Sequence, residues 1–562
     1  MQSIAIILTD LENGRFGHRV SLRDELAGNT VLQHTLDRVA RIDGIDAIVL
    51  LHPEEQSLAG AYVTPDNAPP IQTHAIQTRP GDAWLRGVID SGRKWALTAW
   101  RGGIGGMIVY DELMPAYSIL QAMRRDQAES VVVLRADWCC IDPDLATRQL
   151  RLHRSAPDAM KLTFTQAPPG LSPLVIHRSV LEDMAEHSAT VANLLCYNPK
   201  KPAIDPVGKD VNVPIPAEVR DQFRRFIYDT PRAIDHLRAI ADELGDGFAT
   251  ADASAITDAS RAVETRQPWR QFERLPQQIT VELSPRRAAD GPIVPQHHLD
   301  LPRRDMSPAT IDALLEQLPS VGDASVLFGG LGDTLLHDDW FDTLQRATQS
   351  GLLGVGIETD LLLDDDAIDR LATLPIDVIS VRLNADSAKT YEMLMGVDAY
   401  GDVMDRLQRL FTQRNANRQE NKGFQGWVVP RLVKVAENLA DLETFFERWM
   451  TVSGWAVVDR ALTGRGLIPD MSPVPMEVPR PPDRPIELSR QKHRLTILSD
   501  GTACLCGQDW LGRCALGSLN DASLGELWRD APKLSGSPER WSAVCPACGE
   551  WLEAQRQLMS PV

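Results

Sequence analysis

The chain has 562 residues, of which 43% are hydrophobic and 24% are charged, and its formal net charge is −19. This length predicts about three globular domains rather than one. The negative charge argues against nucleic acid or an anionic membrane as the main partner, because both would be repelled at long range. No apolar stretch approaches the roughly 20 residues that span a bilayer, and the first residues lack the basic start of a signal peptide, so we expect a cytoplasmic protein.

Residues 1–260 begin like a nucleotide-binding α/β sheet. Residues 4–8 and 47–51 are apolar runs typical of buried strands, and Leu32, Leu36 and Val39 between them share one helical face. Strand, loop, helix and strand in this order predict a parallel sheet. Residues 245–275 show no convincing long hydrophobic period. We therefore expect a linker there, which can contain a short helix.

Two carboxylates follow apolar segments in this first part. Asp137 ends the run that starts at Ser130, and the segment 225–231 carries Asp229 before Thr-Pro. Two such carboxylates can share a Mg²⁺ ion that neutralises phosphates. The region resembles the sugar-nucleotide cytidylyltransferase and nucleotidyltransferase fold, in which a strand-end acid and a later Asp-Thr-Pro play that role. The resemblance implies that Asp137 and Asp229 hold magnesium beside a nucleotide or sugar phosphate.

The opening loop departs from that family. The family has a glycine-rich phosphate cradle ending in lysine, whereas residues 9–14 read TDLENG and offer only Arg15, Arg19 or Arg23 as the cation. Acids beside a triphosphate weaken its binding. Three interpretations stay open: an active transferase, a retained sugar- or nucleotide-binding scaffold, and a structural domain in which Asp137 caps a turn.

Residues 276–480 repeat strands and helices. Apolar runs predict strands at 279–283, 324–328, 354–359 and 377–382. Ser307 and Ser387 are expected to cap helices, since each hydroxyl precedes an amphipathic run. Repeated units of this kind close into a full or partial parallel barrel. The strand at 324–328 stops in a glycine-rich loop, which we therefore place at the carboxyl end of a parallel strand, where α/β folds bind ligands.

The glycine-rich loop carries a family resemblance. Residues 329–336, GGLGDTLL, resemble the GGxGEPLL motif of the radical S-adenosylmethionine superfamily, with Asp for Glu and Thr for Pro. Residues 357–362 stand where that family has TNGxLL, and residues 381–396 are similar to its next segment. The resemblance implies a binding site for S-adenosylmethionine: Gly329, Gly330, Gly332 and Asp333 would hold its amino group, with Ser380 and Arg382 near its ribose. The alternative is that these glycines only make tight turns.

The first loop of the barrel lacks the family's reactive centre. Members of the family have CxxxCxxC there, and the thiolates hold a 4Fe-4S cluster that reduces the cofactor. Residues 282–294 contain no cysteine, and none lies between Cys196 and Cys504. We therefore expect no reductive cleavage of S-adenosylmethionine by this route. Arg286 and Arg287 in this loop either bind a phosphate or carboxylate or are solvated.

Five of the eight cysteines cluster near the C-terminus, which in a reducing compartment favours metal ligation over disulfides. Residues 495–506 predict a hairpin around Asp500-Gly501. Together with a later CxxC, the segment 481–562 resembles the SPASM domain, an auxiliary iron-sulfur module, in its single-cluster form. The candidate ligands are Cys504, Cys506, Cys514, Cys545 and Cys548.

The SPASM resemblance implies three of these ligands directly, Cys506, Cys545 and Cys548, while Ile486 stands at the place of a fourth. Either Cys504 or Cys514 is then expected to complete the set, and strand alternation puts Cys504 on the same face as Cys506. Three alternatives stay open: one auxiliary 4Fe-4S cluster, tetrahedral zinc, and an incomplete cluster or free thiols.

We therefore expect an α/β protein of three parts: a nucleotidyltransferase-like domain (1–260), a radical S-adenosylmethionine-like partial barrel (276–480) and a SPASM-like domain (481–562). The leading hypothesis is a protein that has lost the catalytic cluster. It would bind a nucleotide, sugar phosphate or peptide as part of a modifying system, or use S-adenosylmethionine without radical chemistry. The alternatives are an active nucleotidyltransferase with a regulatory second half and a zinc-stapled interaction protein.

Overall fold

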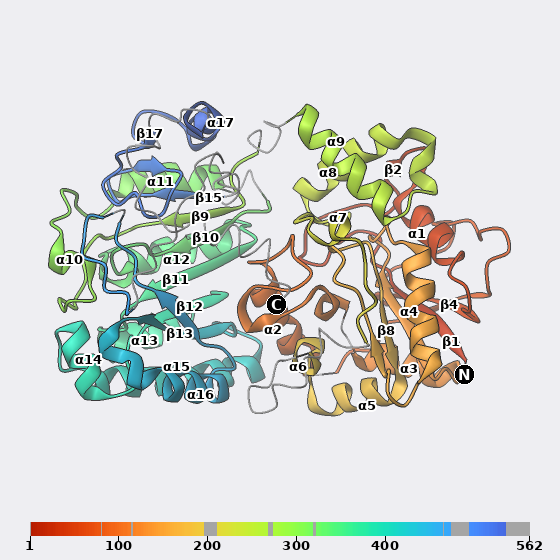
Figure 1. Ribbon diagram of the computed structural model, residues 1–562, viewed down its shortest axis with the longest axis horizontal. Coiled ribbons are helices and arrows are strands. Elements are labelled where there is room, and N and C mark those ends of the chain that lie inside the picture. The colour runs from red at the N-terminus through yellow and green to blue at the C-terminus, as the bar shows by residue number, and fades with distance from the viewer. Residues whose placement is uncertain are drawn as a thin grey trace. The chain divides into compact units, whose positions relative to one another are not determined.

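The chain divides into two compact units, residues 1–268 and 269–561, called unit 1 and unit 2 below (Figure 1). The computed structural model describes residues 2–79, 81–113, 116–195, 211–267, 274–318, 322–464, 466–473 and 494–535. Each unit is built on a sheet with parallel strands and helices, so the predicted α/β class is confirmed. Within these described ranges, no helix combines the length and the apolar character that crossing a membrane requires.

Unit 1 is organised around a six-stranded sheet in the order β5-β4-β1-β6-β8-β7. Its strands are β1 (Ser3–Leu8), β4 (Ala47–His52), β5 (Ile71–Ala75), β6 (Ser130–Arg135), β7 (Leu162–Thr163) and β8 (Leu174–His177), with a separate pair β2 (Glu25–Leu26) and β3 (Asn29–Thr30). Strands β5, β4, β1 and β6 run parallel, and β8 and β7 are antiparallel additions. All six residues of β1 are buried, as predicted for this apolar run.

The helices of unit 1 are α1 (Val31–Val39), α2 (Asp82–Arg93), α3 (Ala116–Arg125), α4 (Pro143–Ser155), α5 (Arg178–His187), α6 (Val191–Leu194), α7 (Ala217–Arg220), α8 (Pro231–Leu244) and α9 (Ala253–Arg266). Helix α8 begins where Thr230 accepts a hydrogen bond from the Ala233 amide and Pro231 fills the first turn. The segment that we expected to be a linker contains the 14-residue helix α9, capped by Asp252. Its buried face is mostly alanine, serine and threonine, so its apolar period is weak in the sequence.

Unit 2 has a nine-stranded sheet in the order β14-β13-β12-β11-β10-β9-β15-β16-β17. Its strands are β9 (Gln278–Val281), β10 (Ser325–Phe328), β11 (Gly354–Thr359), β12 (Val378–Arg382), β13 (Trp427–Lys434), β14 (Val457–Arg460), β15 (Arg494–Ile497), β16 (Thr502–Cys504) and β17 (Ala515–Ser518). Strands β9 to β14 are parallel neighbours in chain order. The C-terminal segment continues the same sheet, because β15 pairs in parallel with β9. The expected boundary near residue 480 therefore falls inside one compact unit and stays a prediction.

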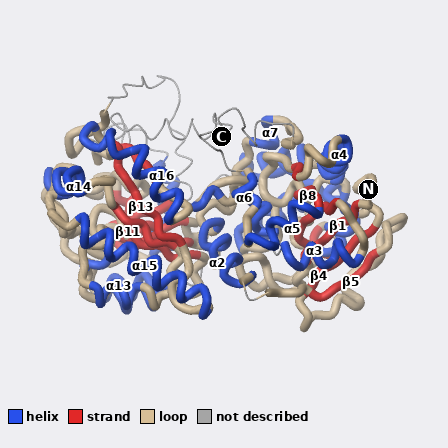
Figure 2. The backbone as a smooth tube through the Cα atoms, turned by 90° about the horizontal axis from the view of Figure 1, so that it is seen from below, coloured by secondary structure: helices blue, strands red, loops and turns tan. Residues whose placement is uncertain are grey.

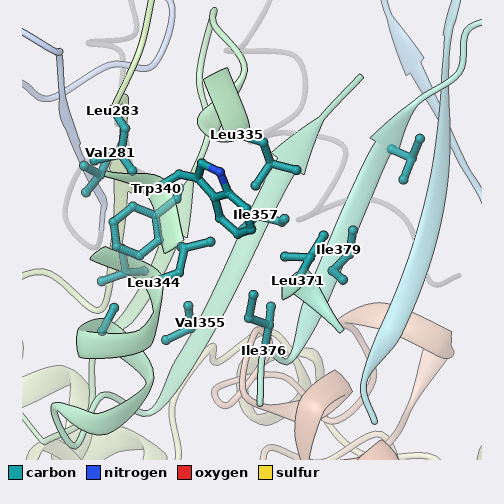
Figure 3. Packing of buried hydrophobic residues seen from close by; sticks show 14 of the residues in the cluster. Val281, Leu283, Leu335, Trp340, Leu344, Val355, Ile357, Leu371, Ile376 and Ile379 are labelled. Carbon is teal, nitrogen blue, oxygen red and sulfur yellow. The ribbon is translucent and has the colours of Figure 1, made fainter. Parts of the chain in front are cut away.

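The helices of unit 2 are α10 (Pro295–His298), α11 (Pro308–Gln317), α12 (Trp340–Gln349), α13 (Asp365–Leu371), α14 (Ala388–Met395), α15 (Tyr400–Glu420), α16 (Leu442–Val452) and α17 (Leu524–Ser535). Ser307 and Ser387 cap α11 and α14, as the sequence predicts. Figure 2 shows α13, α15 and α16 along the sheet that contains β11 and β13. The core lies between sheet and helices, where side chains from β9, β11 and β12 pack against α12 and α13 (Figure 3).

Candidate functional site

The glycine-rich loop follows β10 at the carboxyl edge of the parallel strands, as predicted. Two of its glycines are required by close packing. A Cβ atom at Gly329 would lie 2.6 Å from Oε2 of Glu358, and one at Gly332 would overlap the carbonyl oxygen of Ser284. Gly330 has a φ of +103°, which other residues rarely adopt. The loop conformation is therefore fixed by its glycines.

Several polar backbone groups of this loop are already bound within the chain. The Gly330 amide donates to Oε2 of Glu358 at 3.2 Å. Nη2 of Arg382 donates to the carbonyl oxygens of Gly330 and Gly332 at 2.9 and 3.0 Å, and to Oε2 of Glu358 at 3.2 Å. The structure thus brings Gly330, Gly332 and Arg382 together as predicted site residues, but they bind one another. Ser380 precedes Arg382 by two residues on β12 and is buried.

Glu358 is the centre of the charges at this edge, and the sequence analysis did not single it out. Its second oxygen pairs with Arg431, which also donates to Asp459 at 2.6 and 2.8 Å. Burial would raise the pKa of Glu358, but the guanidinium groups of Arg431 and Arg382 outweigh burial and lower that pKa to about 2. Glu358 is therefore ionised at neutral pH. The available signal was an acid near the end of β11 followed by an arginine on each of the next two strands, at the end of β12 and within β13.

Asp333 connects the glycine-rich loop to the end of β11. Its Oδ2 accepts hydrogen bonds from the Thr359 hydroxyl at 3.0 Å and the Asp360 amide at 2.7 Å, and its Oδ1 accepts one from the Leu335 amide at 3.0 Å. Burial raises the pKa of Asp333, and the charge of Asp360 raises it further. Asp333 thus serves the local fold, and its oxygens are largely engaged.

The first loop after β9 carries two arginines, and both form ion pairs within the chain. Arg287 is buried and pairs with Asp360, while Arg286 is 55% exposed and pairs with Asp305. Both arginines therefore bind a carboxylate, but the carboxylates belong to the chain itself. The loop is also held by its backbone, since the Asp290 amide donates to the Met395 carbonyl at 3.0 Å.

The end of β9 lacks the ligands of the iron-sulfur cluster that the resembling family has at this place. Such a cluster needs thiolates, and this loop has none. Glu282 pairs there with Arg303 at 2.6 and 2.9 Å, and Nη1 of Arg303 donates to the Trp510 carbonyl at 2.6 Å. Both side chains are almost fully buried.

The C-terminal cysteines are only partly described. Cys504 ends β16, Cys506 and Cys514 follow in the next turns, and all three are buried. Cys545 and Cys548 lie outside the described residues. The strand ends at Cys504 with a register irregularity after Ala503, so strand alternation does not extend to Cys506. Burial raises the pKa of Cys504, and the nearby charges of Asp509 and Cys506 add to the effect. Across the described part of the chain, no group of three or more His, Cys, Asp or Glu side chains could hold a metal ion.

In unit 1 the structure brings Asp137 and Asp229 into one buried cluster. The Tyr228 amide donates to the Asp137 carbonyl at 2.8 Å, and Gly14 of the opening loop packs on the backbone of Asp229. Burial raises the pKa of Asp137 despite the opposite effect of Arg135, and the charge of Asp229 raises it further. The two carboxylates therefore lie close enough to affect each other.

Each of these carboxylates faces an arginine. Arg135 donates from Nε and Nη2 to both oxygens of Asp137 at 2.9 to 3.1 Å. Arg225 donates from Nε to Asp229 at 2.9 and 3.1 Å, and from Nη2 to Glu112 at 2.7 Å. A Mg²⁺ ion needs carboxylate oxygens that are free to coordinate it. The donor types suit magnesium, but the oxygens are taken by guanidinium groups that the sequence analysis missed.

Glu112 completes this network from the segment after α2. It also accepts from Nε of Arg93 at 2.8 Å, and Arg93 and Glu112 are fully buried. Burial would raise the pKa of Glu112, but Arg225 and Arg93 lower it to about 2. The opening loop joins through Arg15, which donates to the Glu112 carbonyl at 2.9 Å and to Asp90 at 2.9 Å. Of the three cations offered by the opening loop, Arg15 is therefore built into the cluster.

No family model and no curated protein matches the sequence. Among solved structures, BtrN in complex with AdoMet and 2-DOIA aligns with 14% identity over 51% of this chain and 92% of that chain, with a TM-score of 0.32. Streptococcus suis SuiB bound to precursor peptide SuiA aligns with 13% identity over 50% of this chain and 71% of that chain, with a TM-score of 0.38. A cytidylyltransferase from Leptospira borgpetersenii aligns with 14% identity over 48% of this chain and 95% of that chain, with a TM-score of 0.29. Likeness at this level carries no conclusion about activity or ligands.

Proposed function

We propose that this chain is a radical S-adenosylmethionine-type protein without radical chemistry. It would bind a nucleotide, sugar phosphate or peptide as a component of a modifying system in the cytoplasm. The observation that carries the proposal is the first loop of unit 2. It offers no sulfur to iron, and its charged side chains are engaged in the pairs Glu282–Arg303 and Arg287–Asp360. The cluster that donates the electron in the resembling family would therefore have no ligands here.

The state of the glycine-rich loop supports the same proposal. The resemblance to the radical S-adenosylmethionine superfamily implies that the carbonyl oxygens of this loop accept hydrogen bonds from the amino group of S-adenosylmethionine. Two of these oxygens already accept from Nη2 of Arg382, and the same nitrogen also donates to Oε2 of Glu358. A ligand ammonium has to displace a charge-assisted contact of the chain itself. We therefore expect S-adenosylmethionine to bind weakly or not at all.

The test is direct. The full chain is reconstituted anaerobically with iron and sulfide, given S-adenosylmethionine and dithionite, and assayed for 5′-deoxyadenosine by chromatography. We expect none, and no calorimetric heat at millimolar S-adenosylmethionine. Turnover to 5′-deoxyadenosine would refute the loss of radical chemistry, whereas binding without turnover would leave a protein that uses the cofactor in another way.

We also propose that the C-terminal cysteines hold one metal centre, with an auxiliary 4Fe-4S cluster preferred to zinc. The support is the burial of Cys504, Cys506 and Cys514 near one another in sequence, together with the CxxC of Cys545 and Cys548. About four irons per chain and a broad visible absorption are expected after reconstitution. Stoichiometric zinc with a colourless protein would instead select the zinc-stapled alternative.

A further inference from the structure

Two adjacent cysteines lie in the turn that follows β6. The Ile141 amide donates to the Trp138 carbonyl at 3.1 Å, which places Cys139 and Cys140 at the two central positions of a β-turn. Both cysteines are unbridged and 0% exposed. Because they are neighbours in the chain, a bond between their sulfur atoms needs no movement of distant elements. The pair is therefore suited to intramolecular thiol chemistry.

A buried arginine on α1 contacts the same turn. Nη1 of Arg38 donates to the Ile141 carbonyl at 3.2 Å. The guanidinium also donates to the carbonyl oxygens of Ala251 and Phe248, at 2.7 and 2.5 Å. Arg38 is 0% exposed, and within the described ranges its Nε has no hydrogen-bond partner and no carboxylate pairs with it. Arg38 is thus a buried cation whose hydrogen-bond acceptors are all neutral.

One thiol of the pair is able to balance the charge of Arg38, since a buried cation is stabilised by a negative charge beside it. The hydrogen bond from Cys139 lowers the pKa of Cys140, and the charge of Arg38 lowers it further, although burial acts in the opposite direction. The same hydrogen bond raises the pKa of Cys139 well above its ordinary value, and burial adds to the rise. Of the nearby charges, Arg38 lowers the pKa of Cys139 and Asp137 raises it. Cys140 is therefore the thiol that ionises, and Cys139 keeps its proton.

We propose that Cys139 and Cys140 form an oxidation site, which a small hydroperoxide converts to a disulfide between adjacent residues. The Cys140 thiolate attacks the terminal oxygen of the hydroperoxide and breaks its O–O bond. This step leaves a sulfenic acid on Cys140, and the other oxygen takes up a proton and leaves as water or an alcohol. The Cys139 sulfur then attacks the sulfenic sulfur, and its proton leaves with the hydroxyl group as water while the S–S bond forms. The two thiols lose two electrons, and the peroxide gains them.

The bridge is reversible because of the spacing of adjacent residues. Their Cα atoms lie about 3.8 Å apart across a peptide bond, whereas most disulfides join Cα atoms at least about 4.4 Å apart. Such a bridge is strained, and thiols reduce it readily. The disulfide carries no charge, so oxidation leaves Arg38 as an uncompensated cation at its contacts with Phe248 and Ala251. The site belongs to unit 1 and is independent of the chemistry proposed for unit 2.

The test follows a single tryptic peptide. Cleavage after Arg135 and Arg148 gives residues 136–148, which contain Cys139 and Cys140 and no other cysteine. The folded full chain is treated with hydrogen peroxide at pH 7, catalase stops the reaction, and iodoacetamide is added in urea before digestion. By mass spectrometry we expect the peptide to lose two hydrogen atoms, to escape alkylation, and to regain both thiols with dithiothreitol.

Two comparisons separate an activated pair from two buried thiols without a role. Burial alone protects a thiol, so the chain unfolded in urea would then be oxidised faster than the folded chain. An ordinary thiol is only a few per cent ionised at pH 7, so a stabilised Cys140 thiolate should make the folded chain react at least about fivefold faster. Cys139→Ser should stop at the sulfenic acid of Cys140, which dimedone labels, and Cys140→Ser should leave Cys139 unlabelled.

Three results would overturn the proposal: slower oxidation of the folded chain than of the unfolded chain, a peptide that keeps two alkylatable thiols, or dimedone on Cys139 instead of Cys140. The comparison of folded and unfolded protein uses the original chain. It therefore decides the question even where a serine variant fails to fold.

Discussion

Replacing Glu358 by glutamine removes the charge that links β11 to β12 and β13 of unit 2. The carboxylate accepts from Arg382 and Arg431 and from the Gly330 amide, and the residue is 8% exposed. Glutamine has nearly the same shape but no charge, so the two guanidinium groups lose their common partner in a buried place. We expect the variant to fold with the same secondary structure and to be less stable.

The magnitude follows from the pKa of this group. A pKa of about 2 in the folded chain, against the ordinary 4.5, corresponds to roughly 3 kcal/mol of stability at neutral pH. Because the folded-state pKa is depressed, this contribution is complete above pH 4.5 and is lost as the pH falls through 2. About 2 kcal/mol of it should be gone by pH 3.

Unfolding in urea is measured at pH 7 and at pH 3. It is monitored by hydrogen exchange of peptides from β10 to β12, so that only unit 2 is observed. Glu358→Gln should be less stable at pH 7 and should lose less on acidification than the original chain. Asp369→Asn is the control, because its carboxylate forms an exposed pair with Arg409 and should change little. Equal pH dependence in the original chain and Glu358→Gln would refute the assigned role of the charge.

Three further substitutions test other parts of the structure. Gly332→Ala should destabilise unit 2 by about 3 kcal/mol or more in urea unfolding, because the new Cβ meets the backbone of the first loop, whereas Gly401→Ala on the open face of α15 should be neutral or slightly stabilising. Asp111→Asn should flatten the pH profile of unit 1: burial raises the Asp111 pKa to about 6, so its contribution to stability is complete below pH 3.8 and disappears as the pH rises through 6. Arg382→Ala leaves two loop carbonyls without their donor, and millimolar methylguanidinium should raise its melting temperature more than that of the original chain. Equal shifts in both proteins would contradict this last expectation.

The strands and caps were predictable because their causes are local. The apolar runs of β1, β6 and β11 and the hydroxyl of Ser387 each act within a few residues of chain. Helix α9 was missed because small residues carry its buried face. The positions of the candidate site residues followed from the same local logic, since a loop after a parallel strand must lie at the carboxyl edge of the sheet.

The partners of those residues were not predictable, because they come from distant parts of the chain. Arg431 is 73 residues from Glu358, and Arg225 is 113 residues from Glu112. A single sequence does not state which of its 58 lysine and arginine side chains will meet a given carboxylate. Only the fold decides whether a strand-end acid is free to bind a ligand or is already neutralised.

Whether a buried carboxylate is free or already neutralised decides which ligands the two candidate sites can bind. A buried carboxylate needs a compensating positive charge, and either a bound cation or a side chain of the protein can supply it. Arginine supplies it permanently, because its guanidinium keeps its proton at every physiological pH. Arg225 beside Asp229 and Arg382 beside Glu358 therefore neutralise their sites without any ligand. A cationic ligand must displace a guanidinium to enter such a site, whereas an anion can bind to an arginine that is already held in place. For this reason Arg135 beside Asp137 and Arg225 beside Asp229 argue against a magnesium ion between the two carboxylates of unit 1.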